Sequence, residues 1–344
     1  SGLEILNEGG NPNLKPNSDV LRPVLNAIEI TKKGERRWLV SFPPNGKLEA
    51  AAGYAAPMKF VRKNVYPERK KNHRKTYRDN WWLPGEARPA MQAALARLPR
   101  FIATPRVSKH RVFVWIRPEC LPSDATVAFA SSDDFLFGLL HSRFHEVWAL
   151  AQGTQLREKE SGFRYTPTTC FETFPFPFAD DLSELNSGEA KLNAAKHYSH
   201  IVLREEPPPY RAGKPEKKSA TELRDAIASA AEELNELRER WLNPPEWTEE
   251  KPLQFPGSVD GPWARYIVPK SVDKKTGVGT VIYPRLEPRD ADCAAKLKDR
   301  TLTKLYNERP AWLDLAHKKL DAAVAAAYGW PADLTDEAIL EKLL

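Results

Sequence analysis

The sequence is poor in cysteine and methionine, and its few cysteines are widely spaced. They are Cys120, Cys170 and Cys293, and no CxxC pair or Cys/His cluster occurs. This pattern indicates neither a disulfide framework nor a zinc site. Neither of the two methionines stands at the start of the chain, which begins with Ser1. We therefore expect the sequence to be a piece of a longer protein.

Signals for export and for membrane insertion are absent from the sequence. It contains no signal peptide and no apolar run long enough to span a bilayer. We expect no membrane partner and a reducing, cytoplasmic location. The 41% hydrophobic and 28% charged residues are ordinary for a globular protein, and 344 residues suffice for two domains.

Catalytic signatures are missing as well. The sequence has no G-x-S-x-G, P-loop or Rossmann glycine pattern, and no P-D…E-x-K order for metal-dependent cleavage. It also lacks the F-x-G-x-G loop that binds an adenosyl donor. We therefore predict no catalytic residue, no metal and no cofactor in this chain.

Two short motifs invite a catalytic interpretation that the surrounding sequence does not favour. Asn243-Pro244-Pro245-Glu246 is similar to the Asn-Pro-Pro-aromatic loop of amino-methyltransferases, but Glu replaces the aromatic residue and an amphipathic helix precedes it. His141 and His145 have the i, i+4 spacing of a metal pair without a third ligand nearby. We interpret the first as a helix end and the second as ordinary packed or surface histidines.

Positive charge is concentrated in one segment. Residues 59–111 contain fifteen Lys and Arg against three acidic residues, a local charge of +12 in a chain whose net charge is +6. The remainder of the chain is therefore acidic. A basic segment on an acidic molecule is typical of a nucleic-acid surface, although a solvated face is an open alternative.

The first half of the chain predicts a mixed α/β domain. We expect strands at 37–42, 101–104, 111–116 and 126–130, and helices at 48–61, 88–98 and 133–150. Ser131 or Ser132 is predicted to cap the last of these helices. A short aromatic-rich strand is then expected to stop at Pro175-Phe176-Pro177, because neither proline offers an N–H to a ladder. The domain is predicted to end at residue 178.

The second half, 179–344, predicts a mainly helical region. Helices are expected at 182–202, 221–242, 301–328 with a break near Pro310, and 336–344. Residues 204–218 are rich in proline and charge and are predicted to form a linker. Residues 246–299 are predicted to be an insertion with a small β-hairpin between 264–268 and 279–283.

Candidate contact residues follow from charge and placement. The connection between the strands at 101–104 and 111–116 offers side chains that can bond base edges: Arg106, Ser108, Lys109, His110 and Arg111. Other basic side chains are suited to phosphate contact: Lys70, Lys71, Arg74, Lys75, Arg78, Arg157, Lys159 and Arg164. Trp81 and Trp82 are candidates for stacking on a base, and we expect one of them to pack inside.

Four segments carry a family resemblance. RDNWWLPGEARPAM (78–91), FIATPRVSKHRVFVW (101–115), FGLLHSRFHEVWAL (137–150) and RYTPTTCFETFPFP (164–177) resemble the target-recognition region of type IIL, MmeI-like restriction-modification enzymes. Residues 302–331 are similar to the C-terminal helical segment of the same enzymes, and the match covers nearly the whole chain in order. Residues 133–178 also resemble, more distantly, the end of a recognition domain in type I specificity subunits.

The resemblance implies a function for the chain. Family members join a nuclease, an adenine-N6 methyltransferase and a recognition module in one polypeptide, and use S-adenosylmethionine and a divalent metal. We therefore expect a sequence-specific module for double-stranded DNA that directs an upstream methyltransferase domain to its target. The alternatives left open are a complete methyltransferase, and a non-specific nucleic-acid or protein-interaction module.

Overall fold

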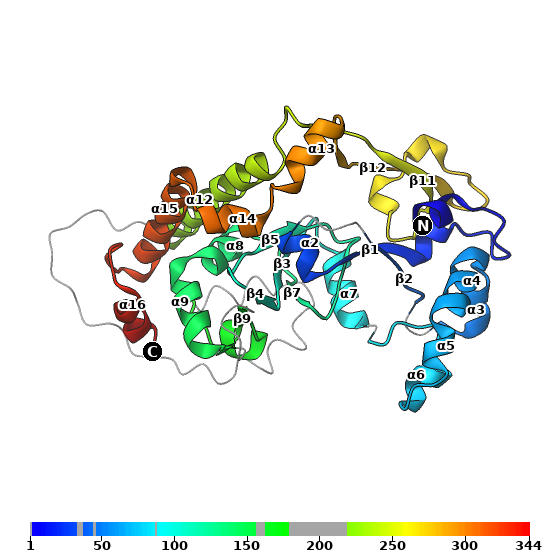
Figure 1. Ribbon diagram of the computed structural model, residues 1–344, viewed down its shortest axis with the longest axis horizontal. Helices are drawn as coiled ribbons and strands as arrows, with labels where there is room; N and C mark the ends of the chain where they lie inside the picture. The colour runs from blue at the N-terminus through cyan, green and yellow to red at the C-terminus, as the bar shows by residue number, and fades with distance from the viewer. Residues whose placement is uncertain (1, 33–36, 44–45, 87, 156–161, 179–218) are drawn as a thin grey trace.

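The computed structural model describes residues 2–32, 37–43, 46–86, 88–155, 162–178 and 219–344 of the chain. Up to residue 178 the chain forms small sheets with short helices, and from residue 219 onward it is mostly helical (Figure 1). This confirms the expected mixed α/β part followed by a mainly helical part. The predicted helix 182–202 and linker 204–218 lie outside the described residues. Within the described part, no helix is long and apolar enough to cross a membrane.

The N-terminal segment begins with α1 (Gly2–Asn7) and a 3-10 turn, η1 (Asn17–Val20). Strand β1 (Leu21–Leu25) then pairs with β2 (Trp38–Val40) in antiparallel fashion and with β6 (Leu121–Pro122) in parallel. Between β1 and β2 lies α2 (Ala27–Thr31). The segment is thereby joined to the central part of the molecule through β6.

Four short helices form a basic arm, which we define as residues 48–79. They are α3 (Leu48–Ala52), α4 (Ala55–Asn64), α5 (Tyr66–Arg69) and α6 (Lys75–Asp79). Figure 1 shows the arm extending from the end of the molecule near the N-terminus. The predicted helix 48–61 is divided at Gly53 and Tyr54, and Pro57 lies in the first turn of α4, where no intrahelical bond is lost.

The central sheet has β3 (Phe101–Pro105) between β5 (Val114–Ile116) and β7 (Thr126–Phe129). Helix α7 (Pro89–Ala96) precedes it. All five residues of β3 are buried, as expected for a central strand. A second sheet, in the order β4-β9-β8, consists of three short strands: β4 (Val107–Ser108), β8 (Thr154–Gln155) and β9 (Phe163–Arg164).

The predicted helix 133–150 is two helices, α8 (Asp134–His141) and α9 (Arg143–Gln152). Ser142 ends the first and caps the second, because its hydroxyl donates to the Leu139 carbonyl and accepts from the His145 N–H. The cap of α8 is Asp133, and Ser131 instead accepts a bond from the Asp133 N–H. The prediction of a strand that runs up to Pro175 is also wrong. Only Phe163–Arg164 form a strand, β9, and Pro167–Phe171 form a π-helical turn, η3.

The C-terminal helices are α12 (Ala220–Leu242), α13 (Ala291–Lys298), α14 (Leu302–Glu308), α15 (Ala311–Tyr328) and α16 (Asp336–Leu343). All of them except α13 pack directly on the first part of the chain. Gly138 of α8 faces α12 so closely that a Cβ there would lie 2.8 Å from Ile227 Cγ2. Phe101, Ile227 and Leu313 belong to one continuous core. The predicted division at 178 thus separates sequence segments that share a core.

The predicted insertion 246–299 contains four strands, and its hairpin differs from the expected one. The strands are β10 (Thr248–Glu250), β11 (Leu253–Ser258), β12 (Val278–Tyr283) and β13 (Leu286–Pro288). β12 pairs along its length with β11, and the expected partner 264–268 meets it only at its end. Ala264–Tyr266 is a 3-10 turn, η4, while Ile267 bridges Val281 and the Val268 N–H donates to the Thr280 carbonyl at 2.9 Å. A second such turn, η5, is Pro269–Ser271. Trp263 packs against the N-terminal segment, and its Nε1 donates to the carbonyls of Ser18 and Leu21.

Arg238 of α12 is a buried cation at the junction between the two parts of the chain. It is 1% exposed. Its Nη2 donates to the Phe113 carbonyl at 2.9 Å, and its Nη1 lies 2.6 Å from His141 Nε2. Because guanidinium has only donors, His141 Nε2 must be an acceptor, so the ring is neutral with its proton on Nδ1. Nδ1 then donates to the Phe137 carbonyl at 3.1 Å.

The remaining buried histidines also bond within the protein. His145 Nε2 lies 3.0 Å from the Tyr165 hydroxyl, and His317 Nε2 lies 3.0 Å from the Tyr306 hydroxyl. Among the described residues, no group of three His, Cys, Asp or Glu side chains could hold a metal. The i, i+4 histidine pair therefore belongs to the core.

The Arg238 bonds give a stability prediction. We expect Arg238→Ala to lower the free energy of unfolding by about 2 kcal/mol, because it removes two bonds to a charged donor and leaves a cavity. Urea denaturation measures this change. Arg240→Ala, at an exposed position of the same helix, should change it by less than about 0.5 kcal/mol. Equal stability of the two variants would mean that desolvation of the guanidinium cancels its hydrogen bonds.

The buried histidines predict a pH dependence of stability. Burial, with the charges of Arg309 and Arg238, lowers the pKa of His317 to about 3. The folded state therefore favours the neutral ring. The neutral His317 ring contributes fully to the free energy of unfolding above the unfolded pKa of about 6.5. As the pH falls from there toward 3, this contribution is lost at about 1.4 kcal/mol per pH unit.

We expect His317→Gln to reduce the slope of unfolding free energy against pH by about one proton between pH 6 and 4. The glutamine oxygen can still accept the Tyr306 hydroxyl, so stability at pH 7 should change little. Urea denaturation of both proteins across this range measures the two slopes. Parallel pH profiles would contradict the assigned pKa.

Candidate nucleic-acid interface

The loop 105–111 leaves the central sheet at the end of β3 and has a fixed backbone. The Arg106 N–H donates to the Ala125 carbonyl at 2.8 Å, and the Arg106 carbonyl accepts from the Tyr165 N–H at 2.8 Å. The next two residues form β4, which pairs with β9. The loop therefore holds its side chains on a rigid base, as a specific contact requires.

Arg111 is directed into the protein instead of outward. Its Nη1 donates to Thr104 Oγ1 at 3.0 Å and to the Pro105 carbonyl, and its Nη2 donates to the Phe163 carbonyl at 3.0 Å. Burial is the main cause that lowers the pKa of Arg111 to about 10. The side chain stays cationic at neutral pH and joins loop 105–111 to β9.

Ser108 is also engaged inside the loop. Its side chain is buried, and its hydroxyl donates to the His110 carbonyl at 2.7 Å. Because the donors of Ser108 and Arg111 bond to main-chain or neighbouring oxygens, we correct their predicted role from base contact to support of the loop. Arg106, Lys109 and His110 remain predicted base contacts.

Lys109 and His110 lie at the tip of the loop and meet a C-terminal helix. Lys109 Nζ donates to Asn307 Oδ1 at 2.7 Å, and His110 Nε2 lies 2.8 Å from the same oxygen. The His110 ring also lies against Tyr306, with 6.0 Å between ring centres. Sequence reasoning missed Asn307, because no local pattern relates it to a loop 197 residues away.

The structure brings the loop after α9 beside loop 105–111. Val107 pairs with Arg164, and Ser108 pairs with Phe163. Gly162 permits this approach: its φ is +83°, and a Cβ there would lie 2.4 Å from the Ser108 carbonyl oxygen. Arg164 is exposed next to the loop and stays a predicted phosphate contact. Arg157 and Lys159 lie outside the described residues.

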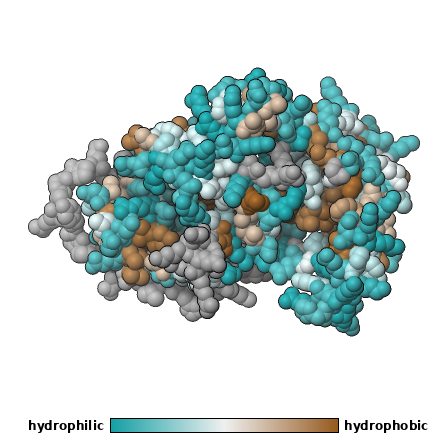
Figure 2. All heavy atoms as spheres, in the orientation of Figure 1, coloured by the Kyte–Doolittle hydropathy of each residue, from teal (hydrophilic) through white to brown (hydrophobic). Residues whose placement is uncertain are grey.

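The basic arm carries the other predicted phosphate contacts. Lys70, Lys71 and Arg74 are exposed in the turn between α5 and α6, and Lys75 is exposed at the start of α6. Arg78 is partly buried, and its Nη1 donates to the carbonyls of Asn72 and His73. Arg78 therefore supports the turn that presents the others. Figure 2 shows hydrophilic side chains covering this lobe.

One residue of the Trp81–Trp82 pair is packed inside, as expected, whereas the other is half-buried and not at the surface. Trp81 is buried, and its ring centre lies 4.7 Å from that of Tyr66. Trp82 is half-buried, and its Nε1 donates to the Gly46 carbonyl at 3.3 Å. The structure thus leaves Trp82 as the candidate for base stacking, and Trp81 holds the arm in place.

An acidic side chain, Glu86, lies within electrostatic reach of both the arm and the loop. The Arg88 guanidinium, 2.8 Å away, is the main cause that lowers the pKa of Glu86, and the charges of Arg74 and Arg106 add to this effect. Sequence reasoning counted Glu86 only as an opposing charge. The Glu86 carboxylate is exposed and paired with Arg88, so it is an opposing charge on this face.

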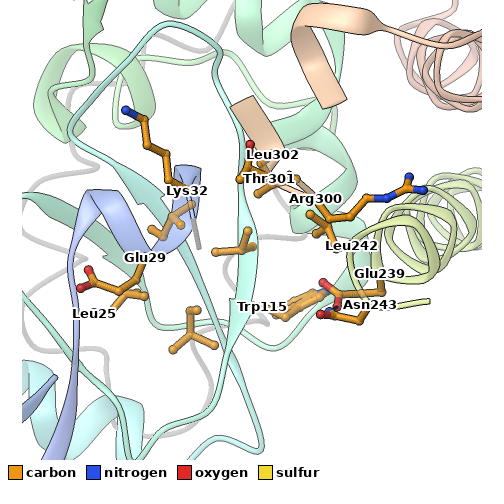
Figure 3. A pocket seen from close by; sticks show the side chains of 13 residues that line it. Leu25, Glu29, Lys32, Trp115, Glu239, Leu242, Asn243, Arg300, Thr301 and Leu302 are labelled. Carbon is orange, nitrogen blue, oxygen red and sulfur yellow. Dashed lines mark hydrogen bonds between the residues drawn. The ribbon is translucent and has the colours of Figure 1, made fainter. Parts of the chain in front are cut away.

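A small pocket of about 210 Å³ lies between α2, β5 and the end of α12. Figure 3 shows Glu29 and Lys32 on one side, and Glu239, Asn243 and Arg300 on the other. Its two carboxylates already have partners: Glu29 bonds Arg37 at 2.8 Å, and Glu239 accepts from Asn243 at 3.1 Å. The pocket therefore gives no reason to place a ligand there.

Comparisons with known proteins agree with a recognition module. Residues 9–178 match the sequence model of a family described as "MmeI, target recognition domain". A solved structure of the type IIL restriction-modification enzyme MmeI in complex with DNA is similar, with a TM-score of 0.53 and 16% sequence identity. The similarity covers 95% of this chain and 30% of that chain, so the present chain spans less than a third of that enzyme's length. No curated protein sequence matches.

Proposed function

Residues 9–178 belong to the family of MmeI target recognition domains, and we propose that the chain selects the DNA target of a larger restriction-modification enzyme. The arrangement of loop 105–111 is the observation that carries this proposal. Its backbone is fixed, Arg106 is only partly buried, and Arg164 lies beside it. These features suit direct contact with base edges, flanked by contact with phosphate.

The larger enzyme is proposed to be a cytoplasmic adenine-N6 methyltransferase that precedes this chain in the same polypeptide. Its S-adenosylmethionine and divalent metal are proposed to bind outside this chain. Within the described residues, no His, Cys, Asp or Glu cluster fits a metal. The role of the chain is then to hold double-stranded DNA so that the target adenine meets the methyltransferase domain.

The basic arm is proposed to contact phosphates without selecting sequence. The cations of Lys70, Lys71 and Arg74 are exposed in the turn between α5 and α6. Such groups attract the DNA backbone and release counterions, and they position the protein on any sequence. Binding by the arm should therefore depend strongly on salt.

We expect Lys70→Ala and Arg74→Ala each to weaken binding to all duplexes alike. Each should lower the slope of log affinity against log salt by about 0.9, the value for one lost phosphate contact. Fluorescence anisotropy across a salt series measures the slope. Lys298→Ala is the matched control, because it removes an exposed cation from α13, on the opposite side of the view from α6 in Figure 1. An unchanged slope in both arm variants would remove the arm from the interface.

Arg106 is expected to determine preference at one base pair. Arg106→Ala should reduce discrimination at that pair by about tenfold, and Arg106→Lys should keep the charge but lose the bidentate contact with guanine. Selection from a random-sequence duplex pool, followed by binding to singly substituted duplexes, measures this. Full recovery of preference by lysine would show that Arg106 acts through charge alone.

Competition among duplex DNA, RNA and heparin separates this function from its alternatives. A recognition module should prefer its selected duplex at all salt concentrations. Equal affinity for the three polyanions would instead identify a non-specific or protein-interaction surface.

A further inference from the structure

A helix outside the matched domain holds the tip of loop 105–111. The matched region ends at residue 178, and the contact comes from Asn307 near the end of α14. The amide oxygen of this residue accepts from Lys109 Nζ at 2.7 Å and meets His110 Nε2 at 2.8 Å. One side chain thus contacts both consecutive residues that the loop presents at its tip.

The helix that carries Asn307 is itself firmly attached. Leu302, Leu305 and Tyr306 of α14 are buried in the main core. The Tyr306 hydroxyl bonds His317 of α15, and Thr303 Oγ1 donates to the Thr31 carbonyl of α2 at 3.0 Å. Asn307 follows the buried Tyr306 directly, so its side chain starts from a fixed backbone position.

The chemistry of the three groups fixes their orientation. An ammonium has only donors, so the oxygen of the Asn307 amide, and not its nitrogen, must face Lys109. The same oxygen then requires a proton on His110 Nε2. In the neutral ring Nδ1 is left as an acceptor, and the Asn307 NH₂ group remains a donor. The contact therefore sets both the position of the lysine charge and the tautomer of the histidine.

We propose that Asn307 is a positioning residue for target selection, which fixes Lys109 and His110 so that they discriminate at one base pair. Lysine is a point charge on a flexible stem, and without a fixed position it attracts any acceptor nearby. Holding it against Asn307 restricts it to one location relative to the rigid loop. This inference rests on the proposed function of the chain.

The test uses the whole chain and two substitutions of the same residue. Asn307→Leu removes the oxygen and releases both partners. Asn307→Asp keeps an oxygen acceptor for both partners but replaces the NH₂ group. Glu308→Leu is the control, because it places the same leucine at the neighbouring exposed position of α14. Each protein is offered a random-sequence duplex pool, and binding is then measured to singly substituted versions of the wild-type site.

We expect Asn307→Leu to reduce discrimination at one base pair by about tenfold and to leave the other pairs and the melting temperature unchanged. Asn307→Asp should restore most of the discrimination. In a Lys109→Ala/His110→Ala background, Asn307→Leu should have no further effect, because its partners are gone. Glu308→Leu should keep the wild-type preference.

The outcomes separate failure of this inference from failure of the proposed function. If the wild-type chain enriches no sequence from the duplex pool, the proposed recognition function is wrong, and so is the proposed role of Asn307. If the wild-type chain is selective and Asn307→Leu selects the same site, only the role of Asn307 is wrong. The same holds if Asn307→Leu weakens all duplexes equally, or if its effect persists without Lys109 and His110.

Discussion

The buried guanidinium of Arg238 is the interaction on which the arrangement of the two parts depends. A cation removed from water needs fixed dipoles around it, and these come from separate elements: the Phe113 carbonyl, the His141 ring of α8, and the face of Tyr306 on α14. Each must be in place for the charge to be accommodated. Phe113 follows loop 105–111 by two residues, so this interaction also fixes where the loop begins its return to the sheet.

Charge serves different purposes in the two basic regions. On the arm, cations such as Lys70 and Arg74 are exposed in the turn between α5 and α6, where they can contact backbone phosphates. Around loop 105–111, the cations are held by neighbours: Arg111 by carbonyls and Lys109 by Asn307. The cations of the two regions thus differ in what they contact: aromatic rings on the arm, and oxygen acceptors around the loop.

The sequence predicts the helical half best, because α12, α14, α15 and α16 combine regular apolar spacing with clear ends such as Gly329. It fails where one residue changes the local structure. Ser142 begins a second helix where the sequence predicts one continuous helix. Pro256 and Gly257 are residues that strands disfavour, so the sequence does not predict β11. In the site, composition identifies the arm but does not show that Arg111 points inward. Asn307 escapes sequence reasoning entirely, because only the tertiary fold places it at Lys109.

The insertion 246–299 has a consequence for how the chain folds. Trp263 and Phe255 complete the small core of the N-terminal segment with Leu6 and Leu21, and the Ser18 hydroxyl bonds the Pro256 carbonyl 238 residues later. During synthesis β1 and β2 therefore remain without this apolar cover until residues 255–263 have left the ribosome. Closing so long a loop is slow compared with local pairing. Exchange of residues 9–178 alone between relatives would leave this core half replaced, so the unit that can be transferred intact is larger than the domain defined by sequence.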